Sequence, residues 1–196
     1  MYRSIITGSG AYIPEHIVSN SDFLSNVFYS EGGLPIENTP DQVVEKFSNI
    51  TGIVQRRYAT DGLSASHMAA RAAELAISDS GMNKESLDHI IVAHNFGDLK
   101  GNMSFPDFVP SLAARVKHLL NITNPACIPY DLIFGCPGWL QGMIHSDAFF
   151  KAGIGKTALI IGAETLSRFL DPHDRDSMIF SDGAGPITLE YKEVHD

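Results

Sequence analysis

The sequence predicts an α/β fold in which a mostly parallel sheet is covered by helices on both faces. Short apolar, β-branched runs alternate along the chain with segments of helical length and pattern, as expected of strands that are buried between helices. With 196 residues, of which 44% are hydrophobic, the chain can bury one full core. We therefore expect a single domain over residues 1–196.

The first part of the chain is predicted to contain one strand and two helices. Residues 3–13 are expected to form a strand, and residues 20–28 a short helix followed by a loop rich in Ser, Gly and Pro. Residues 39–42, Thr-Pro-Asp-Gln, combine proline in the first turn with a capping-box pattern, which predicts a helix over residues 41–49. Extended chain should begin again at residues 51–53.

The middle of the chain alternates helix, strand and helix. A broad apolar face runs through the alanine-rich residues 64–80, and Gly81 supplies a C-terminal stop, so this segment should be helical. Residues 89–93 have the composition of a buried strand. A helix over about residues 110–120 then leads to the next strand.

Residues 126–142 run from an apolar strand into a helix start and place Cys136 at the junction. Gly135 permits a sharp turn, Pro137 suits the first helical position, and Gly138 lets another backbone approach. Cys136 would then occupy the N-cap, where unpaired N–H groups and the helix dipole favour the thiolate that attacks carbonyl carbon. A lone cysteine is more often a buried core residue, but this setting favours a nucleophile.

The rest of the chain completes the alternation. Residues 136–153 should form a helix, residues 157–162 a buried strand, and residues 184–191 a final strand after the turn Ser-Asp-Gly-Ala-Gly at 181–185. The other cysteine, Cys127, lacks a glycine and proline setting and is expected in the core. Nine strand positions span about 30 Å, too far for a disulfide with Cys136, so we expect reduced cysteines and a cytoplasmic protein.

Composition excludes several classes of function. The formal charge is −9 with only 14 Lys and Arg, which argues against nucleic acid and disfavours anionic membrane surfaces. The N-terminus has no apolar run long enough for a signal peptide, and no stretch approaches the ~20 apolar residues of a membrane helix. We expect a soluble protein that is not exported by that route.

Three short motifs suggest cofactor or metal sites but lack required parts. Gly-Ile-Gly-Lys-Thr at 153–157 resembles the end of a phosphate-binding loop, yet Phe150 stands where the first glycine belongs. Gly8-Ser-Gly10 is followed by Pro14 where a dinucleotide-binding helix would start. The acidic residues 171–176 lack the glycine and distal glutamate of a calcium loop. No cofactor and no metal site are predicted, and His89 and His94 are expected to pack or cap.

Six segments, in order, resemble β-ketoacyl-acyl-carrier-protein synthase III, a thiolase-fold condensing enzyme family of fatty-acid synthesis. They are Ile-Ile-Thr-Gly-Ser-Gly-Ala-Tyr-Ile-Pro-Glu at 5–15, Thr-Gly-Ile at 51–53 with Arg57, Phe105-Pro106, residues 131–138, Leu-Asp-Pro-His-Asp-Arg at 170–175 and Phe-Ser-Asp-Gly-Ala-Gly at 180–185. The resemblance covers nearly the whole chain but only the N-terminal half of the family. It implies the N-terminal half of a thiolase-like fold, with a mixed, mostly parallel, five-stranded sheet.

The resemblance also implies a reaction and its partners. Cys136 would accept an acyl group from acyl-CoA, and the acyl-enzyme would condense with malonyl-acyl carrier protein after loss of carbon dioxide. The backbone N–H of Cys136 would be one oxyanion-hole donor. Arg175 would lie near the CoA entrance, and Phe105 would border the acyl pocket of the partner in a homodimer.

The chain departs from the family pattern at several places. Phe134, Pro137 and Trp139 are unusual around the cysteine, which predicts an acyl pocket of different shape. The tryptophan that stacks on the CoA adenine has no counterpart, and Val54 replaces an arginine, so a carrier-bound acyl donor is an alternative. The family's catalytic His and Asn belong to its second half, and we expect no condensing activity from residues 1–196 alone.

Two other functions remain open from the sequence. One is a synthase III-like enzyme of a secondary-metabolite pathway, which the residues around the cysteine make a serious alternative. The other is a non-catalytic thiolase-fold partner subunit, against which the retained Cys136 argues.

Overall fold

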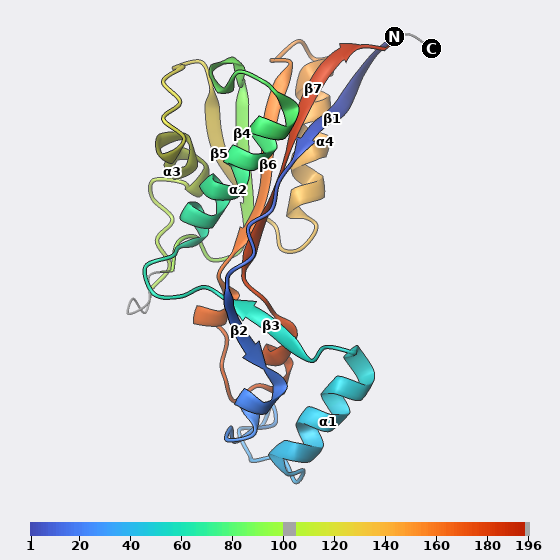
Figure 1. The fold of residues 1–196 in the computed structure, drawn as a ribbon, viewed down its shortest axis with the longest axis vertical. Helices are drawn as coiled ribbons and strands as arrows, with labels where there is room; N and C mark the ends of the chain where they lie inside the picture. The colour runs from blue at the N-terminus through green and yellow to red at the C-terminus, as the bar shows by residue number, and fades with distance from the viewer. Residues whose placement is uncertain (100–104, 195–196) are drawn as a thin grey trace.

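The computed structural model describes residues 1–99 and 105–194, which form a layered α/β body and a smaller lobe (Figure 1). The body is built on a sheet with the strand order β1-β7-β6-β4-β5. In that order, its strands are β1 (Tyr2–Ser9), β7 (Gly183–Glu193), β6 (Thr157–Glu164), β4 (His89–His94) and β5 (Ile128–Ile133). The expected five-stranded mixed sheet is confirmed.

The sheet contains fewer parallel pairs than the sequence predicted. β4 pairs in parallel with both β5 and β6, whereas β7 runs antiparallel to both β6 and β1. Each parallel pair is connected through a helix, and each antiparallel pair includes the C-terminal strand β7. The carboxyl ends of β4, β5 and β6 therefore lie at one edge of the sheet, together with the start of β7.

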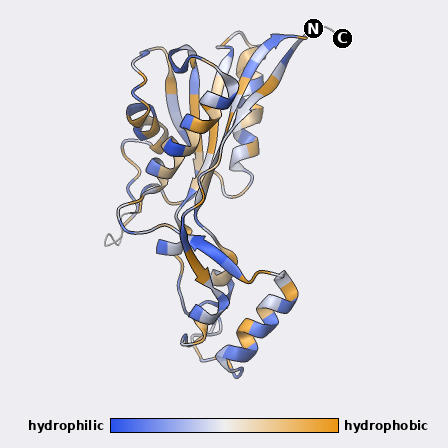
Figure 2. Ribbon diagram, viewed as in Figure 1, coloured by the Kyte–Doolittle hydropathy of each residue, from blue (hydrophilic) through white to orange (hydrophobic). Residues whose placement is uncertain are grey.

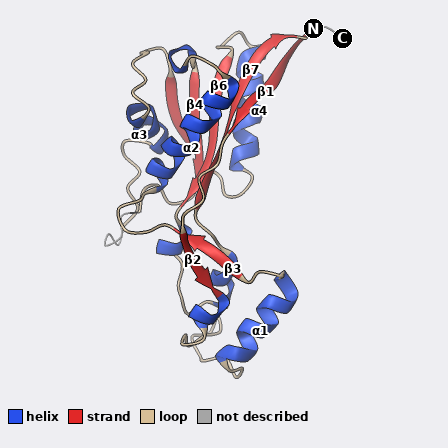
Figure 3. Cartoon of the chain, viewed as in Figure 1, coloured by secondary structure: helices blue, strands red, loops and turns tan. Residues whose placement is uncertain are grey.

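Helices cover both faces of this sheet, as predicted (Figures 1 and 3). α2 (Ala65–Ser80) and α3 (Leu112–Leu119) pack on one face, and α4 (Gly138–Lys151) packs on the other. The alternation of side chains along β4 explains this division, because Ile90 and Val92 join the α2 and α3 side, while Ile91 joins the α4 side.

Close contact between β1 and α2 requires glycine at two positions. A Cβ atom at Gly8 would lie 2.3 Å from the carbonyl oxygen of Ala76, and one at Gly10 would lie 2.3 Å from that of Ala72. The two glycines of the Gly8-Ser-Gly10 motif thus allow this close packing against the helix.

The smaller lobe consists of the hairpin β2 (His16–Ser19) and β3 (Gln55–Tyr58), together with α1 (Pro40–Thr51). Hydrophobic and hydrophilic residues alternate around α1 (Figure 2). The lobe has its own hydrophobic cluster, whose buried members are Val18, Phe23, Phe28, Val43, Val44 and Met178. Residue Met178 comes from a short 3₁₀ helix, Arg175–Ile179, so the lobe combines segments distant in sequence.

The predicted element boundaries hold better for helices than for the first strands. The first strand ends at Ser9 rather than at residue 13, although Tyr12 still bridges to Ala184. β2 was not predicted. The prediction of a helix over residues 20–28 is wrong, because only a single 3₁₀ turn forms, at Asn20–Phe23. The chain then leaves the helical conformation, and Phe28 is buried in the lobe.

Candidate active site

A hollow of about 320 Å³ lies at the carboxyl ends of β4, β5 and β6, beside the start of β7. Cys136 lines it from the connection between β5 and α4, and Trp139 lines it from the first turn of α4. The other lining residues are Ala93, His94, Asn95, Gly135, Gly162, Ala163, Glu164, Leu166 and Ser181 to Gly185. The predicted nucleophile is thus exposed at a concave site formed where several strands end, which is a common location for binding sites in α/β folds.

The turn before α4 positions the cysteine. Gly135 has a φ of 72°, a left-handed conformation that favours glycine, and its carbonyl accepts a hydrogen bond from the Gly138 N–H at 3.0 Å. The Pro137 carbonyl then accepts from the Gln141 N–H at 2.9 Å, so Pro137 is the N-cap and the helix begins at Gly138. The prediction of Cys136 as the N-cap is therefore wrong by one residue.

The displacement of the helix start has a local cause. Pro137 completes the tight turn that Gly135 begins, which delays the first helical residue. Among the described residues, no acceptor takes the backbone N–H of Cys136. This N–H lies near the N-terminus of α4, the positive end of the helix dipole. Gly138 also fits closely here, since a Cβ would lie 3.0 Å from the Cβ of Ala93, which would have to shift slightly.

The second cysteine is part of the core, as predicted. Cys127 is buried immediately before β5, and the structure shows both cysteines as free thiols. Burial raises the pKa of the Cys127 thiol. Cys127 should therefore react much more slowly with electrophiles than the exposed Cys136.

His94 lines the hollow but both of its ring nitrogens are occupied. Nδ1 accepts a hydrogen bond from the Gly97 N–H at 3.0 Å, which leaves the proton on Nε2, 3.0 Å from the Asp131 carboxylate. Asp131 also accepts from the N–H groups of Leu112 and Ala113 at the start of α3. The predicted packing and capping role of His94 fits this network better than a role as a general base.

Asn95 and Glu164 also line the hollow, and sequence analysis did not identify them. Oε2 of Glu164 accepts hydrogen bonds from the Asn95 backbone N–H at 2.7 Å and from its side-chain Nδ2 at 2.8 Å. These bonds direct Oδ1 of Asn95 toward the turn at Gly135, 3.8 Å from the position that a Cβ would take there. Asn95 directly follows β4, and Glu164 is the last residue of β6. A polar residue at the end of a buried strand is the sequence signal that could have identified them.

Asp182 of the Asp-Gly-Ala-Gly segment has a structural role beside the hollow. Its carboxylate accepts from the N–H and hydroxyl of Ser167 at 3.0 and 2.5 Å, and from the Ala59 N–H at 2.8 Å. Its own N–H donates to the Arg57 carbonyl. Asp182 is buried and joins the small lobe to the edge of the sheet.

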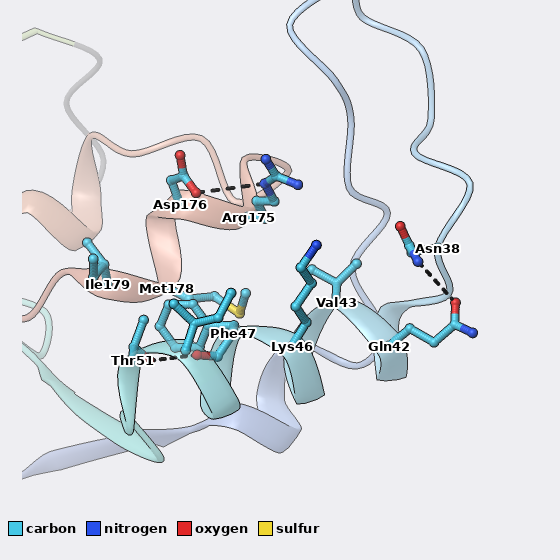
Figure 4. Close-up of a pocket in the computed structure, with 11 residues that line it drawn as sticks. Asn38, Gln42, Val43, Lys46, Phe47, Thr51, Arg175, Asp176, Met178 and Ile179 are labelled. Atoms are coloured by element: carbon cyan, nitrogen blue, oxygen red, sulfur yellow. Dashed lines mark hydrogen bonds and ion pairs between the residues drawn. The ribbon is translucent and has the colours of Figure 1, made fainter.

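Arg175, predicted near a CoA entrance, lies in a separate groove of about 360 Å³ (Figure 4). Val43 and Phe47 of α1, with Met178 across from them, give the groove an apolar wall. Lys46 and Arg175 bring positive charge to it, and Arg175 lies 3.8 Å from Asp176 in an exposed ion pair. The structure does not bring Arg175 together with Cys136 in one cavity.

Phe105, predicted at a partner's acyl pocket, does not line the hollow either. Its side chain is 77% exposed and immediately follows residues 100–104, which lie outside the described part of the chain. Val109, four residues further on, is 85% exposed, so two strongly exposed apolar side chains lie close together in sequence here.

The described residues contain no group of three His, Cys, Asp or Glu side chains that could hold a metal ion. Residues 171–176, which include the acidic cluster, are exposed. Within residues 1–99 and 105–194, no helix is long and apolar enough to cross a membrane.

Comparisons with known proteins point to one family. The family model described as 3-oxoacyl-[acyl-carrier-protein (ACP)] synthase III matches residues 130–196. Curated relatives named β-ketoacyl-[acyl-carrier-protein] synthase III include one from Granulibacter bethesdensis, 38% identical over 198 residues, and one from Bradyrhizobium diazoefficiens, 34% identical over 192 residues. These alignments cover 100% and 97% of this chain but only 54% and 52% of the relatives.

Solved structures give the same result. The chain is similar to 3-oxoacyl-[acyl-carrier-protein] synthase III from Aquifex aeolicus, with a TM-score of 0.77 and 29% identity over 98% of this chain and 55% of that one. The synthase III of Thermus thermophilus gives a TM-score of 0.74 and 29% identity over 97% and 52%. The chain thus spans about half the length of the relatives that it matches.

Proposed function

Because the chain is a homologue of the 3-oxoacyl-[acyl-carrier-protein] synthase III family of thiolase-like condensing enzymes and corresponds to its N-terminal portion, we propose that Cys136 is its acyl-accepting nucleophile. The observation that supports this most directly is the position of Cys136, exposed in a hollow at the carboxyl ends of three strands. A cysteine that served only to pack the core would resemble Cys127 instead.

Acyl transfer would begin with attack of the Cys136 thiolate on the carbonyl carbon of an acyl-CoA thioester. The negative charge that develops on the carbonyl oxygen would be stabilised by the free N–H of Cys136. Collapse of this intermediate breaks the bond to the CoA sulfur, releases CoA thiolate and leaves the acyl group as a thioester of Cys136.

Condensation would use a second substrate, malonyl-acyl carrier protein. Its malonyl group loses carbon dioxide, and the resulting carbanion attacks the acyl-enzyme carbonyl to form a 3-oxoacyl product and free the cysteine. The resemblance assigns the promotion of this step to a His and an Asn outside residues 1–196. His94 is a poor substitute, since both of its nitrogens already have partners. We propose that residues 1–196 support acyl transfer without condensation.

The groove between α1 and Arg175 is the proposed entrance for the acyl donor. Its apolar wall suits a flexible carbon chain, and Lys46 and Arg175 suit phosphate groups of CoA or of a carrier-protein arm. We also propose a homodimer in which Phe105 borders the acyl pocket of the second copy, and a cytoplasmic location, which the two free cysteines favour.

A secondary-metabolite condensing enzyme is the second candidate, and Trp139 favours it. The indole ring lies in the hollow, with ring atoms 3.6 to 3.9 Å from where a Cβ at Gly162 would be. Such a bulky side chain beside Cys136 would reshape the space for the acyl group. A panel of acyl donors would distinguish this candidate from an enzyme of fatty-acid initiation.

The test is to incubate the chain with acetyl-CoA, with and without malonyl-acyl carrier protein, and to measure intact mass and 3-oxoacyl product. We expect one acetyl group on Cys136, none in Cys136→Ser, and an unchanged adduct in Cys127→Ser, which serves as the matched control. No 3-oxoacyl product should form. Absence of any adduct would contradict the nucleophile assignment, and accumulation of product would contradict the requirement for groups outside residues 1–196.

A further inference from the structure

Two aspartates and one arginine meet close to Phe105 in the described part of the chain. The backbone N–H groups and carbonyls of Asp98 and Asp107 form reciprocal hydrogen bonds of 3.1 and 3.0 Å. Arg115 of α3 bridges their side chains, with Nη1 3.0 Å from Asp98 and Nη2 2.8 Å from Asp107. We call these three residues the Arg115 clasp.

The clasp is anchored to the rigid body of the protein. Asp98 is buried and also accepts from the N–H and hydroxyl of Ser66, at 2.9 and 2.6 Å, at the start of α2. Gly97 fits tightly against the clasp, because a Cβ there would lie 2.7 Å from the carbonyl oxygen of Asp107. Charge-assisted hydrogen bonds therefore connect Asp98 to α2 and both aspartates to α3.

The clasp holds an exposed apolar surface close to it. Phe105 is two residues before Asp107 and is 77% exposed, and Val109, two residues after it, is 85% exposed. An apolar contact loses less binding free energy to ordering when its backbone is already fixed. The two ion pairs of Arg115 fix the backbone at Asp107, between Phe105 and Val109.

We infer that Arg115 is a positioning residue, which holds Phe105 at the angle needed to close the acyl pocket of a second copy and so contributes to acyl-length selectivity. This inference rests on the proposed function, because it uses the role proposed for Phe105. Neither Arg115 nor its aspartate partners line the hollow that contains Cys136.

The test compares Asp107→Asn, Arg115→Met and Phe105→Ala with the wild-type chain. Asp107→Asn is the mild variant, since it keeps the buried pair between Arg115 and Asp98. Equal amounts of acetyl-CoA and octanoyl-CoA would compete for Cys136, and intact mass would give the ratio of adducts. We expect all three variants to shift this ratio toward octanoyl by about fivefold, as loss of an interaction of ~1 kcal/mol would. Arg71→Met, which removes an exposed arginine of α2, should leave the ratio unchanged.

Hydrogen–deuterium exchange provides a second measurement that does not need acylation. The amides of Asp98 and Asp107 should exchange faster in Asp107→Asn and Arg115→Met, while α4 stays as protected as in wild type. Unchanged exchange would overturn the clasp, and faster exchange with an unchanged adduct ratio would overturn its role in selectivity. A wild-type chain that forms no adduct would refute the proposed function, and with it the role in selectivity. Exchange would then still decide whether Arg115 fixes the backbone at Asp107.

Discussion

Arg56 shows how a single side chain organises the smaller lobe. It is buried, and its Nε donates to the Met178 carbonyl at 2.9 Å while Nη2 donates to Oδ1 of Asn20 at 2.8 Å. Its guanidinium lies 4.8 Å from the ring centroid of Phe23. Burial lowers the pKa of Arg56, because desolvation disfavours the charged guanidinium. The hydrogen bonds and the ring contact offset this cost.

We expect Arg56→Lys to destabilise the protein by about 2–3 kcal/mol, because an ammonium cannot reproduce the planar set of donors and would leave buried acceptors without partners. Urea denaturation followed by circular dichroism measures this change. Arg57→Lys is the matched control, since the guanidinium of Arg57 is less buried and donates long, weak bonds of 3.3 and 3.4 Å to the carbonyls of Glu15 and Pro14. Equal losses in the two variants would contradict the importance of Arg56.

Arg56 and Arg57 also show what could and could not be predicted from the sequence at single positions. Cys136 was identifiable because glycine and proline act on the local backbone. The family motif was matched with Arg57 as the arginine that follows Thr51-Gly-Ile, to within one residue. In the structure, the buried arginine is Arg56. The alternation of β3 decides which side chain faces the core, and that strand's pairing with β2 was not visible in the sequence.

At the scale of elements, α1 depends on a capping box that the sequence revealed. Oγ1 of Thr39 accepts from the Gln42 N–H, and the Gln42 side chain accepts from the Thr39 N–H at 3.0 Å. The helix provides Lys46 and one wall of the groove in Figure 4. Its N-terminal cap therefore affects the proposed donor entrance as well as stability.

Thr39→Ala should destabilise the protein by about 1 kcal/mol, because the Gln42 N–H would lose its acceptor. Thr39→Ser keeps the hydroxyl and should remain within a few tenths of a kcal/mol of wild type. Thermal unfolding of both variants tests this expectation. A Thr39→Ser variant as unstable as Thr39→Ala would show that the threonine methyl group, rather than the cap, is important.

Elements with local signals were predicted well, and elements defined by distant partners were not. The caps of α1 and α2 lie beside them in sequence, so these helices were identified within two residues at each end. β2 has only four residues and pairs with a strand more than 30 positions later. At the site, Asn95 and Glu164 meet only because β4 and β6 are neighbours in the sheet. Such contacts follow from topology rather than from local pattern.

At the scale of the whole molecule, the body and the smaller lobe are joined at Asp182. Its carboxylate receives hydrogen bonds from Ser167, after β6, and from Ala59, after β3. The lobe carries the groove with Arg175, and the body carries the hollow with Cys136. In the proposed reaction an acyl donor would span both, so this junction would control how the groove and the hollow are aligned.

Asp182→Asn tests the junction. One carboxylate oxygen would become an NH₂ group that faces the N–H of either Ser167 or Ala59, which leaves buried donors without an acceptor and should cost about 2–3 kcal/mol. The only tryptophan, Trp139, is in the body, so its fluorescence follows the body while circular dichroism follows both parts. We expect the circular dichroism transition of Asp182→Asn to occur at lower urea than the fluorescence transition, because the lobe separates first.

Asp176→Asn, at an exposed aspartate, should keep the two transitions coincident and at the wild-type midpoint. Coincident transitions at the wild-type midpoint in Asp182→Asn would show that the lobe and the body are held together by other contacts.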